Sequence, residues 1–561
     1  MGEKTNSYSL TRRDFIVAAG SLAVLPAAAR GRIQDIRSVA AGSAVDGDVC
    51  IIGGGPAAIA IARRLAPTGA RITIFESGGL EYDEATQALY AGENVGVPYF
   101  DLDVTRLRYL GGCSNHWGNQ ISDFEPIDFE KREWIPYSGW PIIRSDLDDY
   151  YNVAFECLDL GDFDLHERGK WAGLGNDFQI FDPEDAAFTS KVFRRRLPAL
   201  AVGKHYYHWL TTTPNVRLFL NANATRIALN AAGTSVEHVD LATLDGKRFK
   251  AKARQFVIAC GGLENPRLLL SSNDVQPAGI GNQNDNVGRF FMDHLRIESG
   301  VLDAAPGRSF TAYDEYYAAK FGRAASIYIR PEVQAREKIS VFRMKFVARD
   351  AGKFTQGYKG GRGFVTDALH GRAGRMGTNA ARLLLDPAGA WTGAWSTVTR
   401  RTERSCVNVI EQTPNPASRV TLSGARDALG MPRLRLDWRL SDIEQNTLVR
   451  AQELLRRDFQ THGLGSLKVE MKEGELWTGV EEGASFLPST RFEGGHHHTG
   501  TTRMGTDPRT SVVDADCRVH DVANLYVAGS SVFPTLGSAN PTATICALAA
   551  RLADHLAANR A

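Results

Sequence analysis

The sequence predicts an α/β fold with at least two domains, and three observations support this prediction. A strand, a glycine-rich turn, a helix and a second strand follow one another between residues 49 and 76. A second apolar strand enters another glycine turn at 255–262. From about residue 300 to 485 the pattern changes to longer strands and one long helix. A chain of 561 residues is also too long for one simple core.

The first strand, residues 49–52, is apolar throughout, as is typical of a buried parallel strand. It leads into residues 53–58, which fit the pattern G-x-G-x-x-A. Gly53 allows a tight turn, Gly55 lets the backbone approach a pyrophosphate, and Ala58 permits close packing of the next helix on the strand. These features predict a parallel, Rossmann-like unit.

Glu76 ends the second strand and lies 23 residues after Gly53. A carboxylate about 20 residues after the first glycine is typical of the group that accepts a hydrogen bond from a ribose hydroxyl. Phosphate would lie at the N-terminus of the intervening helix. We therefore expect a dinucleotide site; the alternative is an ordinary strand-to-helix turn.

Some later segments repeat this order of apolar strand, glycine turn and helix, and others differ from it. A helix is expected to start at Asn265, with Pro266 in its first turn. Within residues 350–400, the run Gly360-Gly361-Arg362-Gly363 indicates a mobile lid, a docking surface or a solvated insertion. The remaining expected elements are strands at 216–221, 235–243, 255–260, 340–348, 418–422 and 433–440, and a helix at 441–460.

Composition and charge narrow the classes of function. The net charge of +1 gives no reason to expect a nucleic-acid partner. The seven cysteines show no C-x-x-C and no metal-ligand spacing, so we expect core residues and no metal site. The first thirty residues, with Arg12-Arg13 before an apolar stretch at 16–25, resemble a twin-arginine export signal. This predicts a periplasmic or secreted protein; the alternative is a disordered cytoplasmic N-terminus.

Four further motifs accompany the glycine turn: G-G-C-S-N-H-W at 111–117, E-Q-T-P-N-P-A-S-R-V at 411–420, H-H-H-T-G-T-T-R-M-G at 496–505 and G-S-A-N-P-T-A-T at 537–544. In their order and spacing they resemble the glucose-methanol-choline (GMC) oxidoreductases, particularly the bacterial branch similar to pyranose oxidases and sugar dehydrogenases. The resemblance covers most of the chain after about residue 45.

The resemblance implies a Rossmann-like FAD-binding domain of the GMC type and an α+β substrate domain with an antiparallel sheet. The predicted boundaries are a signal peptide at 1–30, a linker at 31–45, FAD-binding parts at 46–130 with a flavin-covering loop, 211–300 and 486–561, a cap segment of the substrate domain at 131–210, and the substrate domain itself at 301–485.

The implied reaction is oxidation of an alcohol, in which the hydroxyl proton is removed while hydride passes from carbon to flavin N5. The family pattern H-x-x-G-T selects His497 as the proton acceptor. Asn540 is implied as the partner that hydrogen-bonds the developing alkoxide. The histidines at 496–498 are otherwise a metal-binding loop or a structural cluster, and on an extended backbone His497 would face away from its neighbours. Asn540 before Pro541 is also typical of a helix N-cap.

His116 precedes Trp117 as in pyranose oxidases, where that histidine is bonded covalently to FAD. His116 is therefore a candidate for the same bond, and the alternative is a contact beside the ring. Gln412 and Asn415 are candidate substrate contacts, with turn formation as the alternative. The other implied cofactor-binding residues are Gly53, Gly55, Ala58, Glu76, Gly112, Ser114, Asn115, Gly529, Asn540 and Thr542.

These inferences combine into an exported FAD-dependent dehydrogenase or oxidase acting on a primary or secondary hydroxyl of a sugar or glycoside, with a keto-sugar or aldehyde as product. The alternatives are a non-redox lyase on the same scaffold, a dehydrogenase of non-sugar alcohols, and a binding protein that retains FAD structurally. Oxygen, a quinone or a separate cytochrome would accept the electrons, since the chain contains no haem-attachment motif C-x-x-C-H.

Overall fold

The computed structural model describes residues 32–161, 163, 178–314, 322–350, 402–469 and 492–559, with a few single positions between 361 and 387. The predicted export signal, and the run at 360–363 except for Gly361, lie outside the described residues. Two hydrophobic cores, one around a parallel sheet and one around an antiparallel sheet, organise the rest. The predicted α/β class, with an antiparallel second sheet, is confirmed.

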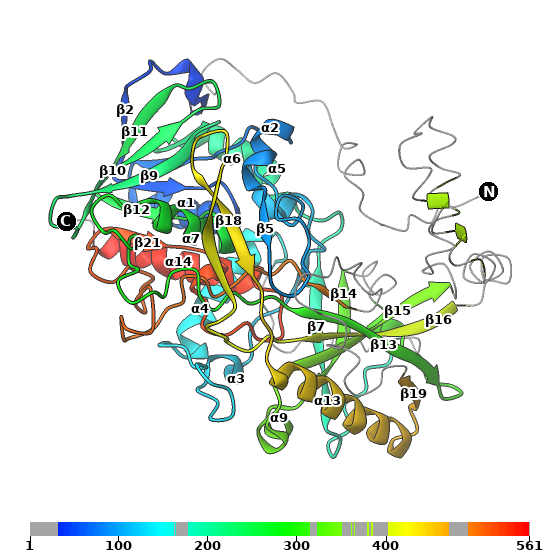
Figure 1. Cartoon of the computed structure of the whole chain (residues 1–561). Helices are drawn as coiled ribbons and strands as arrows, with labels where there is room; N and C mark the ends of the chain where they lie inside the picture. Colours follow the sequence, from blue (N-terminus) through cyan, green and yellow to red (C-terminus); the bar gives the residue numbers. More distant parts are fainter. Residues whose placement is uncertain are drawn as a thin grey trace, which may run out of the picture.

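A six-stranded sheet, parallel throughout, lies at the centre of the first hydrophobic core (Figure 1). Four of its strands are buried at every position, so both faces of the sheet must be covered there: Val49–Ile52, Ile72–Phe75, Gln255–Ile258 and Leu525–Val527. In spatial order they are β1 (Ile33–Asp35), β8 (Val216–Leu220), β4 (Ile72–Phe75), β3 (Val49–Ile52), β12 (Gln255–Ile258) and β21 (Leu525–Val527).

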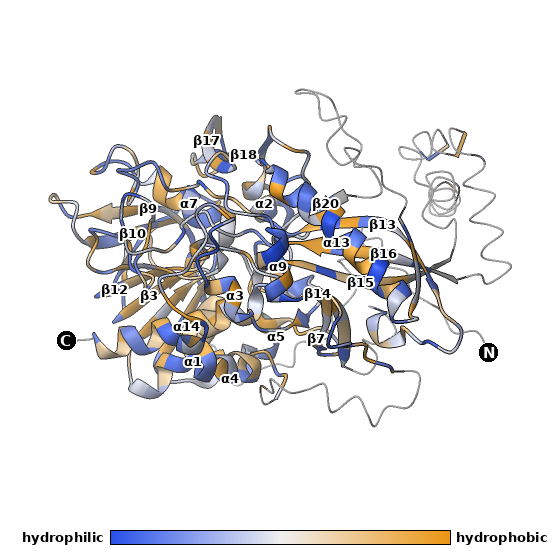
Figure 2. Cartoon of the chain, turned by 90° about the horizontal axis from the view of Figure 1, so that it is seen from below, coloured by the Kyte–Doolittle hydropathy of each residue, from blue (hydrophilic) through white to orange (hydrophobic). Residues whose placement is uncertain are grey.

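Helices cover one face of this sheet and a smaller sheet lies beyond the other (Figure 2). Gly69, with φ of 76°, ends the short turn that follows the first helix. The covering helices are α1 (Pro56–Leu65), α4 (Asp148–Cys157) and α14 (Thr542–Ala558); the smaller sheet contains β2 (Ala44–Asp46), β11 (Arg248–Lys252), β10 (Val236–Ala242) and β9 (Asn223–Leu229).

Helix α7 (Gly261–Ser271) starts four residues before the predicted start at Asn265. Pro266 therefore lies inside the helix and cannot donate to the carbonyl of Gly262. The hydroxyl of Thr501 donates to that carbonyl over 2.5 Å instead. A contact from a distant segment thus makes the interior proline tolerable, which local pattern alone does not reveal.

The second hydrophobic core surrounds an antiparallel sheet, and helix α13 (Asp442–Thr461) packs on this sheet (Figure 1). Ser441 caps this helix in a capping box with Glu444, close to the predicted start. One strand of this sheet, β6 (Gln120–Ile121), lies within residues 46–130, which were predicted to belong to the first FAD-binding part. The strands are β19 (Gly465–Val469), β13 (Leu295–Ala304), β16 (Thr402–Ile410), β15 (Phe342–Asp350), β14 (Arg323–Ile329), β7 (Phe188–Arg195) and β6 (Gln120–Ile121), with β20 (Phe492–Gly494) paired to β13.

A three-stranded sheet and several short helices complete the described part. The sheet contains β17 (Arg419–Arg426), β18 (Pro432–Asp437) and β5 (Gly92–Asn94). The short helices are α2 (Glu84–Gln87), α3 (Pro126–Phe129), α5 (Val202–His205), α6 (Tyr207–Thr212) and α9 (Pro331–Glu337).

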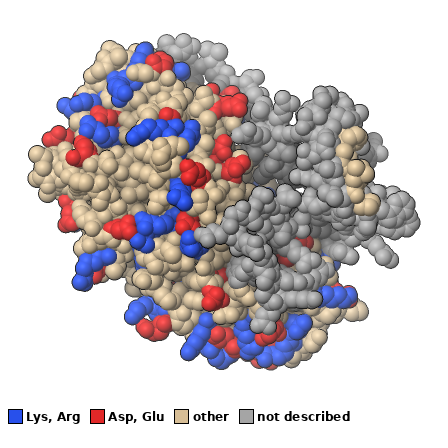
Figure 3. All heavy atoms as spheres, viewed as in Figure 1, with Lys and Arg blue, Asp and Glu red and all other residues tan. Residues whose placement is uncertain are grey.

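Charged side chains of both signs are interspersed over the described surface seen in Figure 3. This agrees with the net charge of +1 and shows no continuous basic stripe on that face of the described atoms. Among the described helices, none combines the length and apolarity that crossing a bilayer requires.

Candidate active site

A cavity of about 810 Å³ lies between the carboxyl ends of the parallel strands and one face of the antiparallel sheet. Gly53, Glu76 and Ala259, which follow β3, β4 and β12, line one part of it. Arg343 and Val409, on β15 and β16, line the other. Ligands of open parallel sheets bind in this position, outside the carboxyl ends of the strands.

The glycine turn forms the floor of the cavity at the N-terminus of α1. Gly53 has φ of 108°, and a Cβ atom there would lie 2.6 Å from the carbonyl oxygen of Ala259. A Cβ atom on Gly55 would meet no described protein atom within 4 Å, although Gly55 lines the cavity. The turn is therefore closed on the protein side and open on the cavity side, where a pyrophosphate would meet the helix N-terminus.

Glu76 lines the cavity and holds the turn together. Its Oε2 accepts from the backbone N–H of Gly54 over 2.7 Å, and its Oε1 accepts from that of Gly78 over 2.9 Å. Burial raises the pKa of this carboxyl, while those N–H donors and the charge of Arg108 oppose the rise. Each carboxylate oxygen retains capacity for a further donor such as a ribose hydroxyl.

The loop at 111–117 places some predicted residues at the cavity and uses others to support itself. Gly112, Ser114 and His116 line the cavity. Asn115 is not among the described lining residues: its Nδ2 donates to the carbonyls of Leu110 (3.0 Å) and Gly112 (2.9 Å). The side chain of Asn115 therefore supports the loop, and its contact with a cofactor stays a prediction.

Other predicted cofactor-binding residues divide in the same way. Gly529 and Thr542 line the cavity. Gly529 follows β21, and Thr542 is the first residue of α14. Ala58 is fully buried in α1 and lies outside the described lining, so its role is helix packing.

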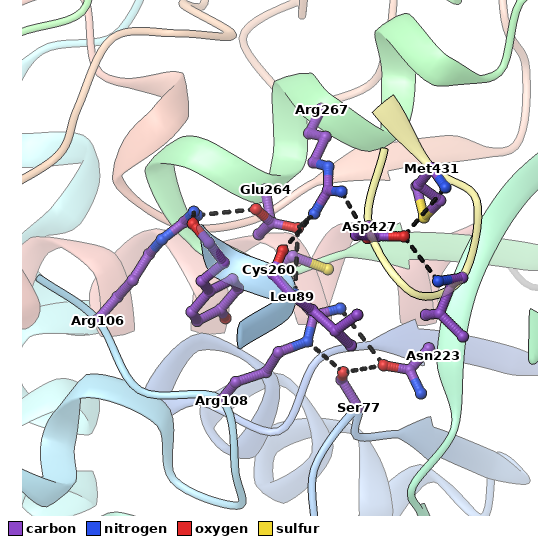
Figure 4. Close-up of polar contacts among 12 residues, drawn as sticks. Ser77, Leu89, Arg106, Arg108, Asn223, Cys260, Glu264, Arg267, Asp427 and Met431 are labelled. Atoms are coloured by element: carbon purple, nitrogen blue, oxygen red, sulfur yellow. Dashed lines mark hydrogen bonds and ion pairs between the residues drawn. The ribbon is translucent and has the colours of Figure 1, made fainter. Parts of the chain in front are cut away.

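Buried charges flank the cavity on the side of Glu76 (Figure 4). Glu264 accepts hydrogen bonds from Arg106 (2.9 Å), Arg108 (3.2 Å) and Arg267 (3.1 Å). Although burial alone would raise it, these cations lower the pKa of Glu264 to about 2. Arg267 also donates to Asp427 over 2.6 Å, which ties α7 to the β17–β18 connection.

At the other end of the cavity two histidines from distant segments meet. The Nδ1 atoms of His294 and His497 lie 2.7 Å apart, and the Nε2 of His294 lies 2.8 Å from the carbonyl oxygen of Gly537. Burial, reinforced by the neighbouring His294 and the positive charge of Arg343, lowers the pKa of His497 well below its ordinary value. His497 is therefore a neutral imidazole whose Nδ1 is already engaged.

Asp293 holds the backbone around both rings. Its Oδ1 accepts from the N–H groups of His294 and His497, each over 2.7 Å, and its Oδ2 accepts from His496 over 3.0 Å and from the Tyr99 hydroxyl over 2.5 Å. Burial raises the pKa of Asp293 to about 6, although these donors oppose the rise. A buried carboxylate with this many donors fixes the turn that carries the histidines.

The flanking histidines point elsewhere, as alternation predicts for His497 relative to its neighbours. His496 stacks on Phe100 with ring centroids 4.4 Å apart, and the Nε2 of His498 lies 2.9 Å from the Tyr99 hydroxyl. The backbone is not simply extended, because His496 has φ of 61°. No group of three metal-binding side chains occurs among the described residues.

Asn540 lines the cavity near His497 but does not cap α14. The helix begins at Thr542, with Pro541 before it and no side-chain cap bond. The Oδ1 of Asn540 instead accepts from Nη2 of Arg343 over 2.8 Å. The predicted N-cap role is thus wrong, because a buried arginine of the antiparallel sheet takes the amide oxygen.

The loop before Asn540 is anchored by a buried ion pair. Glu411 accepts from both terminal nitrogens of Arg132 over 2.7 and 2.8 Å, and from the N–H of Gly537 over 3.1 Å. Because Gly537 also accepts from His294, this loop and the histidine pair are fixed together.

Gln412 and Asn415 do not reach the cavity. Gln412 is fully buried, its Oε1 accepts from Asp293 and Trp438, and its Nε2 donates to the carbonyls of Phe291 and Arg439. The Oδ1 of Asn415 accepts from Ala417 in a turn. Their predicted substrate role is therefore corrected to a structural one.

Comparisons with known proteins agree with this geometry. Two sequence profiles described as GMC oxidoreductase match residues 204–296 and 414–549. Over these two segments the chain is similar to the GMC oxidoreductases. A 2-methyl-1,2-propanediol dehydrogenase of Mycolicibacterium austroafricanum is 26% identical over 92% of this chain and 96% of the relative. A C-glycoside 3-oxidase of Microbacterium trichothecenolyticum is 27% identical over 80% and 75%, respectively.

Solved structures share the GMC fold. A formate oxidase superposes with a TM-score of 0.53 and 18% identity, covering 93% of this chain and 99% of the other. Pyridoxine 4-oxidase from Mesorbium loti gives a TM-score of 0.51 at 16% identity, covering 91% of this chain and 98% of the other.

FAD is the cofactor of GMC oxidoreductases, and the cavity suits it. The open side of Gly55, the helix N-terminus behind it and the carboxylate of Glu76 provide for pyrophosphate and ribose. The flavin would then lie toward the loop at 112–116 and the histidine pair. This family acts on alcohol groups, so the protein is a flavin-dependent oxidoreductase.

The sequence analysis missed four residues that shape the catalytic end: Asp293, His294, Tyr99 and Arg343. The adjacent Asp293-His294 pair just before β13 was an available indication, because carboxylate and imidazole side chains are candidate acid-base groups. Arg343 gave no indication, because basic residues occur throughout β15.

Proposed function

We propose that the protein oxidises a hydroxyl group of a sugar or glycoside, with His497 accepting the hydroxyl proton. The observation that carries the proposal is the neutral, half-buried His497, which lines the same cavity as Asn540. Its Nδ1 faces His294, so Nε2 is the ring atom that remains for substrate. Bound FAD supplies the acceptor for the hydride.

Asn540 would bind the oxygen that loses its proton. Because Arg343 occupies the amide oxygen, the Nδ2 donors of Asn540 are left to face the cavity. A donor held in place stabilises negative charge on the substrate oxygen without becoming charged itself. The buried positive charge of Arg343 acts in the same direction.

A sugar or glycoside is favoured over simple alcohols by the C-glycoside 3-oxidase relative and by the polar lining around Gln120, Asn119 and Lys345. The 2-methyl-1,2-propanediol dehydrogenase relative favours a non-sugar alcohol as the second candidate.

The deciding experiment is the visible spectrum of the purified protein without oxygen, before and after addition of sugars, glycosides and simple diols. Bleaching of the flavin by sugars or glycosides supports the proposal, and bleaching by diols alone selects the second candidate. A substrate that is converted while the flavin stays oxidised would establish a lyase. Reoxidation by oxygen, quinone or a cytochrome then identifies the electron acceptor.

Two further proposals complete this function. We propose a covalent bond between His116 and FAD: His116 lines the cavity, and burial lowers its pKa to about 4, which leaves a neutral nitrogen for bond formation. Flavin that stays with the protein after acid precipitation would support this. We also propose export by the twin-arginine route, which carries folded proteins. Retention of an Arg12→Lys, Arg13→Lys variant in the cytoplasm would support it.

A further inference from the structure

The contact between His294 and His497 requires one proton between two ring nitrogens. Their Nδ1 atoms lie 2.7 Å apart, and the rings are nearly perpendicular, at 88° with centroids 5.0 Å apart. In a hydrogen bond of this kind one imidazole donates and the other accepts. The distance alone does not say which, but the remaining contacts of His294 do.

The second nitrogen of His294 fixes the position of its proton. Nε2 lies 2.8 Å from the carbonyl oxygen of Gly537, which can only accept, so Nε2 carries a proton. Burial and the charge of Arg343 lower the pKa of His294 to about 3, so the ring is neutral and carries no second proton. Nδ1 of His294 is therefore the acceptor and Nδ1 of His497 the donor.

We propose that His294 is a positioning residue that holds His497 in the tautomer protonated at Nδ1, so that Nε2 of His497 stays bare for the substrate. This inference rests on the proposed role of His497 as proton acceptor. A free imidazole exchanges between two tautomers, and only one of them can accept a proton at Nε2. The hydrogen bond from His294 to the Gly537 carbonyl fixes the tautomer of His294, and the bond between the two Nδ1 atoms then fixes the tautomer of His497.

The same contact serves after proton transfer. The substrate O–H bond breaks as the new Nε2–H bond forms, and His497 becomes a cation while its Nδ1–H still donates to His294. The carboxylate of Asp293, which accepts from the backbone N–H of His497, favours this cation, and Arg343 opposes it; His496 and His498 are neutral neighbours. Asp293 keeps both backbones in register throughout.

The direct test uses the unaltered holoenzyme labelled with ¹⁵N-histidine, with the His497 signals identified by their loss in His497→Ala. We expect the shift of a protonated nitrogen at Nδ1 and of a bare nitrogen at Nε2, and the reverse pattern for His294. Protonation of His497 at Nε2 would overturn the proposal without any need for a variant of His294.

Variants supply the functional test. His294→Phe keeps a ring and removes both nitrogens, whereas His294→Asn keeps an acceptor near the Nδ1 position. We expect flavin reduction to slow about 10²-fold in His294→Phe, within the range of acid-base groups, and to recover partly in His294→Asn. His520→Asn is the control, because His520 bonds Ser511 over 2.9 Å outside the described cavity lining.

The two proposals fail in different ways. If His497→Ala reduces its flavin at the parent rate, the proposed function falls. If His497→Ala is slow while His294→Phe matches the parent, or while His294→Asn is no faster than His294→Phe, only the positioning role of His294 falls.

Discussion

Arg343 donates a hydrogen bond from Nη2 to Oδ1 of Asn540 over 2.8 Å, and so joins the antiparallel sheet to the loop that precedes α14. The arginine is almost fully buried, and its guanidinium also lies over the ring of Phe193 at 4.5 Å. The bond sets the orientation of an amide that could otherwise turn its oxygen toward the substrate. A residue of the antiparallel sheet thereby orients a side chain of the segment before α14.

Replacing Arg343 should therefore impair catalysis while FAD remains bound. In Arg343→Met the amide of Asn540 loses its fixed orientation, and we expect flavin reduction to slow about 10²-fold, similar to loss of an oxyanion donor. Anaerobic stopped-flow measures this rate, and the flavin-to-protein ratio measures binding. Arg248→Met, at the exposed first residue of β11 in the small sheet, is the control. A parent-like rate in Arg343→Met would contradict the role of Asn540 as an oriented donor.

Removal of the proton acceptor should be more severe. His497→Ala is expected to slow flavin reduction by roughly 10²- to 10⁴-fold, the range typical of acid-base groups, and to leave FAD content unchanged. His497→Ala also removes the imidazole that contacts His294 and leaves a space there, so the melting temperature should be measured in parallel. Near-normal reduction by a stable variant would exclude His497 from the reaction.

Two glycines of one turn should respond differently to the same methyl group. Gly53→Ala places Cβ 2.6 Å from a backbone oxygen and requires φ of 108°, so we expect loss of stable protein. Gly55→Ala meets no described atom within 4 Å, so we expect a folded protein that binds FAD weakly. Thermal unfolding and flavin titration separate the two effects. Full FAD affinity in Gly55→Ala would place the pyrophosphate elsewhere.

The cluster around Glu264 should make stability depend on pH in the acid range. Its pKa is about 2 in the folded protein and rises to the ordinary value of 4.5 on unfolding. The stabilisation is therefore complete above pH 4.5 and disappears as the pH falls through 2. At neutral pH, Glu264→Gln should lose about 3–5 kcal/mol, because it leaves buried arginines without a counter-charge.

Denaturant unfolding of both proteins at several pH values checks this prediction. The difference in unfolding free energy should shrink as the pH approaches 2. A difference that stays constant between pH 7 and pH 3 would show that the carboxylate charge is not what the arginines require.

Thr501 should prove important through its hydroxyl alone. Thr501→Val removes the donor to the Gly262 carbonyl, which Pro266 cannot satisfy, and should cost about 1–3 kcal/mol for one buried acceptor without a partner. Thr501→Ser keeps the donor and is the matched control. Equal stability of the two variants, measured by denaturant unfolding, would mean that another group satisfies this carbonyl.

The parts of the fold that depend on local pattern could be predicted from the sequence. The strand at 49–52, the glycine turn and the capped helix from Ser441 follow from burial, turn geometry and capping within a few residues. The start of α7 could not be predicted, because Thr501 compensates Pro266 from a distant position.

The candidate site shows the same division. His497, Glu76 and Gly55 lie in recognisable motifs and line the cavity. Gln412 lies in an equally recognisable motif, yet its amide oxygen accepts hydrogen bonds from Asp293 and Trp438. These contacts form only in the folded chain. Spacing identifies a residue with useful chemistry but does not say which partner will saturate it.

The order of strands in the parallel sheet has a consequence for biosynthesis. β21, at residues 525–527, pairs directly with β12, so one edge of the sheet is missing until this later segment has left the ribosome. The segment that carries His497 and Asn540 emerges equally late. A nascent chain can form the glycine turn early, but it cannot enclose a cofactor. Enclosure of the cofactor therefore depends on a segment that is synthesised long after the glycine turn.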